Sequence, residues 1–145
     1  MIIEVGDIIK VRFQKFTDGT IDTNPNGHYA VVTEANENEI EYVFISSKKH
    51  KYVDRIFSVI LNKDDVDCVG LKSNISYVKT AEIYRSNENF MVVGYIAYED
   101  KLEEILNSVK LAKEGIKSGK TQGKKLKVVS SVKKYENKSK TKEKK

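Results

Sequence analysis

Side chains that can transfer protons or bind anions are concentrated in two short β-rich stretches of the 145-residue chain. The first stretch begins at His28, and the second ends in a run of hydroxyl, ammonium and imidazole groups, Ser46, Ser47, Lys48, Lys49 and His50. Histidine takes or gives a proton near neutral pH, serine donates hydrogen bonds to phosphate oxygens, and lysine compensates negative charge. Brought together, these groups suit the binding of a phosphodiester.

These groups can meet only if the two stretches pair with each other. His28–Thr33 and Ile40–Ser46 are rich in β-branched and aromatic residues, and the polar segment Glu34–Glu39 between them suits a turn. An antiparallel hairpin brings the beginning of its first strand beside the end of its second. The sequence therefore predicts that His28 lies near Ser46 at one end of a sheet.

The rest of the folded part is predicted to be the barrel that holds this hairpin. Strands are predicted at Val5–Phe13 with one face inward, at Val53–Leu61, at Ile75–Lys79 leading into Thr80–Arg85, and at Phe90–Ala97 with a break at Gly94. Glu99–Lys113 has apolar residues at three- and four-residue steps, which predicts an amphipathic helix. We therefore expect a mainly β (α+β) fold, in which a small barrel-like sheet is closed by a C-terminal helix.

Two connections have distinct compositions. Gln14–Asn26 contains turn signals but no strong pattern, and a loop of this length between strands is typically functional. Asn62–Asp67 is polar and acidic, which predicts a turn, and the short apolar segment Cys68–Leu71 follows it.

Composition divides the chain into one barrel domain, residues 1–114, and a Lys-rich tail, residues 115–145. Residues 107–145 hold 14 lysines and three acidic residues, a net charge of +11, whereas residues 1–106 carry a net charge of −6. The tail has few large apolar residues that could offset the entropy of ordering, so we expect it to be flexible. A basic tail favours polyanions through salt-sensitive attraction.

Composition also disfavours several classes of protein. The single Cys68 rules out an internal disulfide framework, fits a reducing compartment and is expected to be a small buried residue. We expect no signal peptide, because the first residues carry Glu4 and Asp7 and alternate like a strand, and no apolar run is long enough to span a membrane. The acidic residues lack metal-ligand spacing, and no glycine-rich phosphate loop occurs. We therefore expect a cytoplasmic protein with no cofactor, no metal ion and no membrane partner.

Several segments, taken in order, resemble the MazF/PemK family of toxin endoribonucleases. They are Gly6-Asp7-Ile8-Ile9, Ala30-Val31-Val32, Ile45-Ser46-Ser47, Gly70-Leu71 followed by Ser76-Tyr77-Val78-Lys79-Thr80, and Gly94 with Ile96, Leu102 and Ile105. The run Ser46–His50 also resembles, more weakly, the ToxN-like type III toxins. The resemblance implies an SH3-like barrel that forms a homodimer, cleaves single-stranded RNA without a metal ion and is neutralised by a cognate antitoxin.

The resemblance also implies which residues form the site. The catalytic arginine of the family precedes its second strand, and the matching position here is His28, which would act as acid or base. The hydroxyl position of the family matches Ser46, with Ser47 beside it. Substrate contacts are expected from Lys48, Lys49, His50, Arg12, Arg55 and Tyr29, with either arginine a candidate for the missing guanidinium and the tyrosine for base stacking.

Two hypotheses remain open. In the first, the chain is a metal-independent endoribonuclease toxin whose loop Gln14–Asn26 covers the site. In the second, it is a non-catalytic SH3-like module that has lost the family's arginine and binds nucleic acid or a protein. Each candidate residue also has a structural interpretation, since His28 suits a turn, Ser46 the end of a strand, and the lysines a solvated surface.

Overall fold

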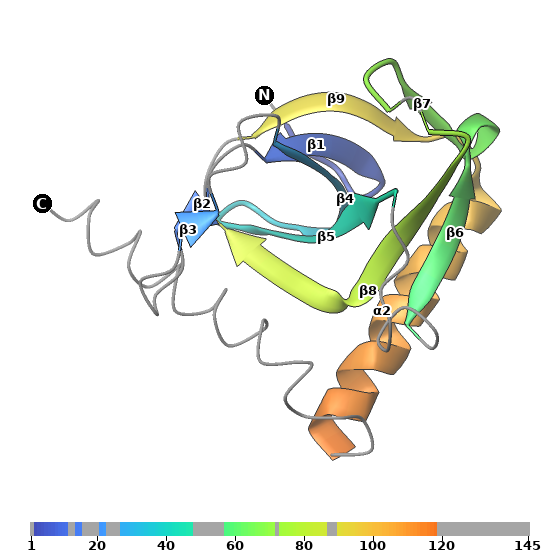
Figure 1. Ribbon diagram of the computed structural model, residues 1–145. Helices are drawn as coiled ribbons and strands as arrows, with labels where there is room; N and C mark the ends of the chain where they lie inside the picture. Colours follow the sequence, from blue (N-terminus) through green and yellow to red (C-terminus); the bar gives the residue numbers. More distant parts are fainter. Residues whose placement is uncertain are drawn as a thin grey trace, which may run out of the picture.

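A computed structural model describes residues 2–11, 14–15, 21–22, 27–47, 57–71, 73–86 and 90–118 of the chain (Figure 1). Its main element is an antiparallel sheet of seven strands in the order β6-β8-β5-β4-β1-β9-β7. These strands are β1 (Asp7–Val11), β4 (His28–Ala35), β5 (Ile40–Ser46), β6 (Ser58–Asn62), β7 (Val66–Cys68), β8 (Ile75–Ser86) and β9 (Met91–Ile96). Helix α2 (Glu99–Ser118) packs against the sheet. The predicted mainly β fold, a barrel-like sheet with a closing C-terminal helix, is confirmed.

The sheet is curled because its two edge strands follow each other in the sequence. β6 and β7 stand at opposite ends of the strand order, yet only the 3-10 turn η1 (Lys63–Asp65) separates them along the chain. A connection of three residues spans only about 10 Å, so the two edges must lie near each other. The sheet therefore bends into the half-barrel seen in Figure 1.

The predicted turn Asn62–Asp67 is wrong in its second half. Val66 begins β7 and pairs with Ile96 of the neighbouring strand. Asp67 lies within β7, and its carboxylate accepts a hydrogen bond of 2.9 Å from the hydroxyl of Tyr95. The acidic composition concealed this strand, because an acidic side chain on an exposed face does not prevent backbone pairing.

Gly94 was expected to interrupt the last strand, and the structure gives it a different role. β9 continues through Gly94, while its pairing with β1 shifts register between Ile8 and Ile9. A Cβ atom on Gly94 would overlap the carbonyl oxygen of Asp67 and the side chain of Cys68. The glycine therefore lets β7 approach β9 closely enough to pair with it.

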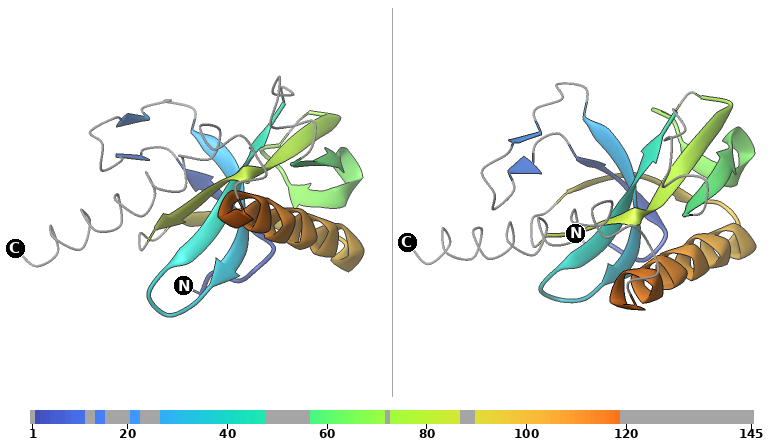
Figure 2. Two further views of the ribbon diagram at one scale, coloured as in Figure 1. Left: turned by 90° about the horizontal axis from the view of Figure 1, so that it is seen from below. Right: turned by 60° about the horizontal axis from the view of Figure 1, so that its bottom comes forward.

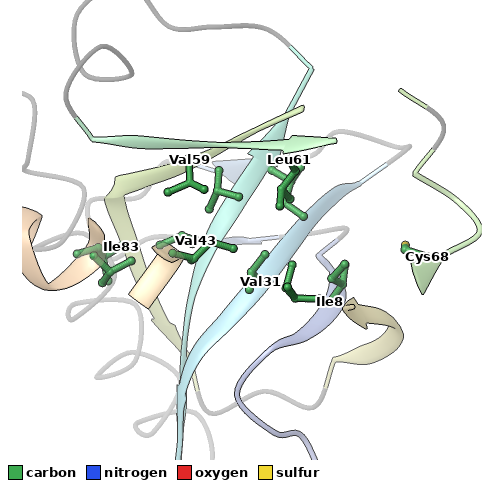
Figure 3. Packing of buried hydrophobic residues seen from close by; sticks show 12 residues of the cluster. Ile8, Val31, Val43, Val59, Leu61, Cys68 and Ile83 are labelled. Atoms are coloured by element: carbon green, nitrogen blue, oxygen red, sulfur yellow. The ribbon is translucent and has the colours of Figure 1, made fainter. Parts of the chain in front are cut away.

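Both faces of the central strands are buried, although the pattern of Val5–Phe13 predicted a single inward face. Ile8 and Ile9, which point to opposite faces of β1, are each 0% exposed. One face carries the main core, Ile8, Val31, Val43, Ile45, Val59, Leu61, Cys68, Val78, Ile83, Ile96, Ile105 and Val109. Labelled members of this core lie in Figure 3 between strands from different parts of the chain. The opposite face carries a second cluster, Ile9, Val11, Ala30, Val32, Ile40, Tyr42, Phe44 and Tyr84, against which Phe90 and Val92 pack.

Helix α2 covers the face of the main core, to which it contributes Ile105 and Val109 (Figure 2). The helix ends at Ser118, beyond the predicted end at Lys113 and beyond the predicted domain boundary at residue 114. A glycine ends a helix most readily when it takes a left-handed conformation. Gly115 does not have a positive φ, so the helix continues through it. No helix in the described part of the chain is both long and apolar enough to cross a membrane.

The long strand β8 bends where it passes β5. Residues 43 and 45 of β5 pair with residues 83 and 78 of β8, so a step of two residues on β5 corresponds to a step of five on β8. The surplus residues of β8 cannot continue the regular ladder, and the strand changes direction there. Beyond this bend, residues 75–79 pair with β6 on one side, while Tyr77 and Val78 also pair with β5 on the other. The bend thus lets one strand belong to two parts of the curled sheet.

Helix α2 holds this bend in place. The hydroxyls of Thr80 and Ser108 lie 2.6 Å apart and share a hydrogen bond between the bend and the helix. Ala81 and Ala112 are each 0% exposed and form a small apolar cluster with Phe57. Because these side chains are small, the helix can approach the strand closely. The direction of β8 in this region therefore depends on contacts with the helix.

The predicted loop Gln14–Asn26 contains a short ladder. β2 (Gln14–Lys15) and β3 (Ile21–Asp22) pair with each other in a separate two-stranded sheet. The sequence pattern missed these strands, because alternation is recognisable only over four or more residues. Residues 16–20 and 23–26, which the covering role of this loop would involve, lie outside the described residues.

Cys68 is a free, buried residue, as predicted. Burial raises the pKa of its thiol above the ordinary 9.0, because the thiolate is poorly solvated in the core. The folded state therefore favours the neutral thiol. This contribution to stability is present below the unfolded pKa and is lost as pH rises toward the folded pKa.

We expect the free energy of unfolding to fall as pH rises above about 9, and to fall less steeply in Cys68→Ala. Urea denaturation at several alkaline pH values measures this slope. The hydrogen bond of Tyr95 to Asp67 also raises the pKa of that phenol, so Tyr95→Phe is the variant needed to separate the two contributions. Equal slopes for wild type and Cys68→Ala would contradict the expectation.

Candidate active site

A cavity of about 580 Å³ lies at the end of the sheet where β4 begins, β5 ends and β8 bends. Its polar lining includes His28, Tyr29, Ser46, Ser47, Ser73, Ser76, Lys79 and Glu82. A concave site of several hundred Å³ with a few convergent polar groups is typical of ligand-binding sites. The pairing of β4 with β5 confirms the predicted hairpin, which brings His28, Ser46 and Ser47 to one cavity. The roles of these three residues stay predictions.

His28 is held at the start of β4. The preceding Gly27 has a φ of 72°, a left-handed conformation that glycine adopts without strain. Strand alternation puts His28 on the face of β4 that carries Ala30, which is the face of the aromatic cluster. Its ring packs against Phe44, with ring centroids 4.9 Å apart. His28 is therefore half-buried, its ring is oriented by Phe44, and the residue lines the cavity.

Ser46 and Ser47 occupy different environments. Tyr29 pairs with Ile45 across the hairpin, and continuing this antiparallel register by one residue puts Ser46 opposite His28. Ser46 is half-buried at the end of β5, whereas Ser47 follows the strand and is exposed. Of the two serines, Ser46 is thus better placed to act together with His28.

Tyr29 forms another part of the cavity wall. Lys10, which pairs with Tyr29 from β1, donates a hydrogen bond of 3.5 Å to the phenol oxygen. The ammonium nitrogen of Lys10 also lies 4.9 Å from the centroid of the Tyr29 ring. The ring packs against the main core, and Gly70 lies directly against its hydroxyl. Tyr29 is therefore fixed by packing, and the base-stacking role expected for it stays a prediction.

The variant Gly70→Ala is expected to destabilise the protein by about 1–3 kcal/mol, because the added Cβ would overlap the hydroxyl of Tyr29. The double variant Tyr29→Phe/Gly70→Ala removes the overlapping oxygen and should recover part of the loss. Urea denaturation measures the free energy of unfolding of each variant. Ser73→Ala, at another residue that lines the cavity, is the control and adds no atom to the wall. If Gly70→Ala were as stable as wild type, Tyr29 could move aside without cost and would not be fixed by packing.

Lys79 and Glu82 line the cavity, although the sequence did not single out either as a site residue. Both belong to β8, far along the chain from the hairpin. Residues three apart in a straight strand point to opposite faces, so alternation offered no reason to group them. Both face one cavity because β8 bends between residues 78 and 83. The one sequence signal that could have indicated a bent strand is the unusual length of the β-rich run Ile75–Arg85.

Five of the expected substrate-binding residues, Arg12, Lys48, Lys49, His50 and Arg55, lie outside the described residues. Their contribution to the site therefore stays a prediction. Within the described ranges, no group of three or more histidine, cysteine, aspartate or glutamate side chains is arranged to hold a metal ion. The described lining offers imidazole, hydroxyl, ammonium and carboxylate groups, which suit acid–base chemistry at an anionic ligand.

Comparison with known proteins adds no assignment. No protein-family model matches the sequence, and no curated protein matches it significantly.

Proposed function

We propose that the protein is a metal-independent endoribonuclease toxin that cleaves single-stranded RNA. The observation that carries the proposal is the gathering of His28, Ser46 and Ser47 in one cavity. An imidazole supplies proton transfer and hydroxyls supply hydrogen bonds to phosphate oxygens, which are the two requirements of cleavage by the neighbouring ribose hydroxyl. The cavity volume of about 580 Å³ is adequate for a small part of an RNA strand.

In the proposed reaction, the ribose 2′-oxygen attacks the adjacent phosphorus and the bond from phosphorus to the 5′-oxygen breaks. A base takes the proton of the 2′-hydroxyl, and an acid gives a proton to the departing 5′-oxygen. His28 performs one of these transfers, while Ser46 and Ser47 donate hydrogen bonds to the non-bridging oxygens, whose negative charge increases in the transition state. The products are a 2′,3′-cyclic phosphate and a free 5′-hydroxyl.

The resemblance to the MazF/PemK family extends the proposal to partners. A toxin of this kind acts in the cytoplasm, forms a homodimer and is held inactive by a cognate antitoxin. The Lys-rich tail, residues 115–145, increases the affinity for RNA in a salt-dependent manner, because Lys-rich segments bind polyanions.

The test is cleavage of a long, mixed-sequence RNA in the presence of EDTA, followed by analysis of the ends. The proposal requires cleavage with 5′-hydroxyl ends, and no cleavage of the same sequence with 2′-O-methyl riboses. Absence of cleavage by the full chain would overturn the proposal. Binding of RNA without cleavage would favour a non-catalytic binding module, which the histidine at the family's arginine position also allows.

A further inference from the structure

We propose that the bend in β8 supplies two further catalytic residues, Lys79, whose ammonium binds the scissile phosphate, and Glu82, whose carboxylate takes the proton of the 2′-hydroxyl. The inference rests on the proposed function and names the groups that complete its site. Both side chains line the cavity that also contains His28 and Ser46. They flank the segment in which β8 departs from a regular strand, between residues 78 and 83.

Neither side chain is engaged elsewhere in the described part of the chain. Lys101 and Lys113 form ion pairs with carboxylates at 3.1 and 2.6 Å, whereas no ion pair or side-chain hydrogen bond of Lys79 or Glu82 occurs among the described residues. The two residues also do not pair with each other, although they face one cavity. Both are half-buried residues of the cavity wall, so the ammonium of Lys79 and the carboxylate of Glu82 are available to a ligand in the cavity. A ligand in the cavity can therefore contact both groups without displacing an ion pair that the structure describes.

Lys79 has the chemistry that a phosphodiester requires. Among the lining residues that the structure describes, it is the only lysine or arginine. A phosphodiester that enters a partly enclosed cavity loses hydration, and a nearby ammonium compensates its charge. Thr80, the next residue, is tied to Ser108 of helix α2 at 2.6 Å, so the backbone that carries Lys79 is fixed before the ligand arrives.

The reaction needs one group that accepts a proton and another that donates one in the same step. His28 can do only one of these, and Glu82 does the other. Its carboxylate takes the proton from the 2′-hydroxyl as the bond from the 2′-oxygen to phosphorus forms. His28, in its protonated form, gives a proton to the 5′-oxygen as the bond from that oxygen to phosphorus breaks. One proton is accepted and one is released, no oxidant or cofactor is involved, and the two groups exchange protonation states during the step.

Binding is measured separately from cleavage. A short, labelled, single-stranded 2′-O-methyl oligonucleotide cannot be cleaved, and fluorescence anisotropy of its complex with the full chain gives Kd. A salt concentration of about 200 mM suppresses non-specific attraction by the basic end of the chain. We expect Lys79→Met to raise Kd about 10-fold or more, and Lys79→Arg to restore much of the affinity. The matched control Lys110→Met, an exposed lysine of α2 outside the cavity, should leave Kd unchanged.

Cleavage of RNA distinguishes the role of Glu82. Glu82→Gln should bind the 2′-O-methyl oligonucleotide as tightly as wild type and lose about 100-fold in kcat. The matched control Glu114→Gln changes an exposed carboxylate of α2 and should retain full activity. Thermal denaturation of every variant excludes loss of folding as the cause.

The outcomes separate this inference from the proposed function. If wild type cleaves RNA and both Lys79→Met and Glu82→Gln cleave it at the wild-type rate, the inference is overturned and the endoribonuclease proposal stands. Absence of cleavage in wild type would overturn the endoribonuclease proposal and the role of Glu82, while binding that depends on Lys79 would still support the anion site. The anion site would also be overturned if the oligonucleotide did not bind, or if Lys79→Met bound it as tightly as wild type.

Discussion

The variant His28→Ala is expected to lose RNA cleavage by about 100- to 10,000-fold, the usual contribution of a positioned acid or base. No other imidazole lines the cavity among the described residues, so the loss has no nearby substitute there. Single-turnover cleavage of a defined RNA measures it, because saturating enzyme separates the chemical step from substrate binding. Activity within about 10-fold of wild type would remove His28 from the mechanism.

A second variant separates chemistry from packing, because the ring of His28 also packs against Phe44 at a centroid distance of 4.9 Å. His28→Phe retains an aromatic ring in this position but cannot transfer a proton. We expect it to be as inactive as His28→Ala while its thermal stability stays close to that of wild type. If His28→Phe cleaved RNA at the wild-type rate, the imidazole would have only a structural role.

The variant Lys113→Met is expected to lower the free energy of unfolding by about 2–3 kcal/mol, because it leaves the carboxylate of Glu41 buried without its closest cation. Glu41 is 3% exposed, and its Oε1 lies 2.6 Å from the ammonium of Lys113 and 3.8 Å from Arg85. Thr33 donates a hydrogen bond of 2.6 Å to Oε2. The remaining arginine and the 40% exposure of Lys113 keep the expected cost below that of a fully enclosed pair.

The matched control for this stability effect is Lys110→Met on the same helix, which should change the free energy of unfolding by less than about 0.5 kcal/mol. The double variant Glu41→Gln/Lys113→Met removes the buried charge together with its partner. It should be less destabilised than the sum of its two single variants, as a double-mutant cycle of urea denaturation would reveal. Simple additivity would mean that Glu41 and Lys113 do not interact.

The local signals of the sequence were sufficient for the central hairpin and for the existence of the helix. Alternation and turn composition determine which residues of His28–Ser46 can pair, because both act over only a few neighbouring residues. The apolar spacing after Glu99 determined the helix in the same way. The part of the candidate site that belongs to one hairpin, His28 with Ser46 and Ser47, could therefore be predicted.

Only the tertiary structure decided which other side chains face the cavity. Lys79 and Glu82 are three residues apart, a spacing that separates side chains in any straight strand. Both line one cavity where β8 bends between residues 78 and 83, and the hydroxyl contact of Thr80 with Ser108 holds β8 in its bent path. Such a bend arises from strands and a helix distant in sequence. Its contribution to the site therefore leaves no periodic pattern in the amino-acid sequence.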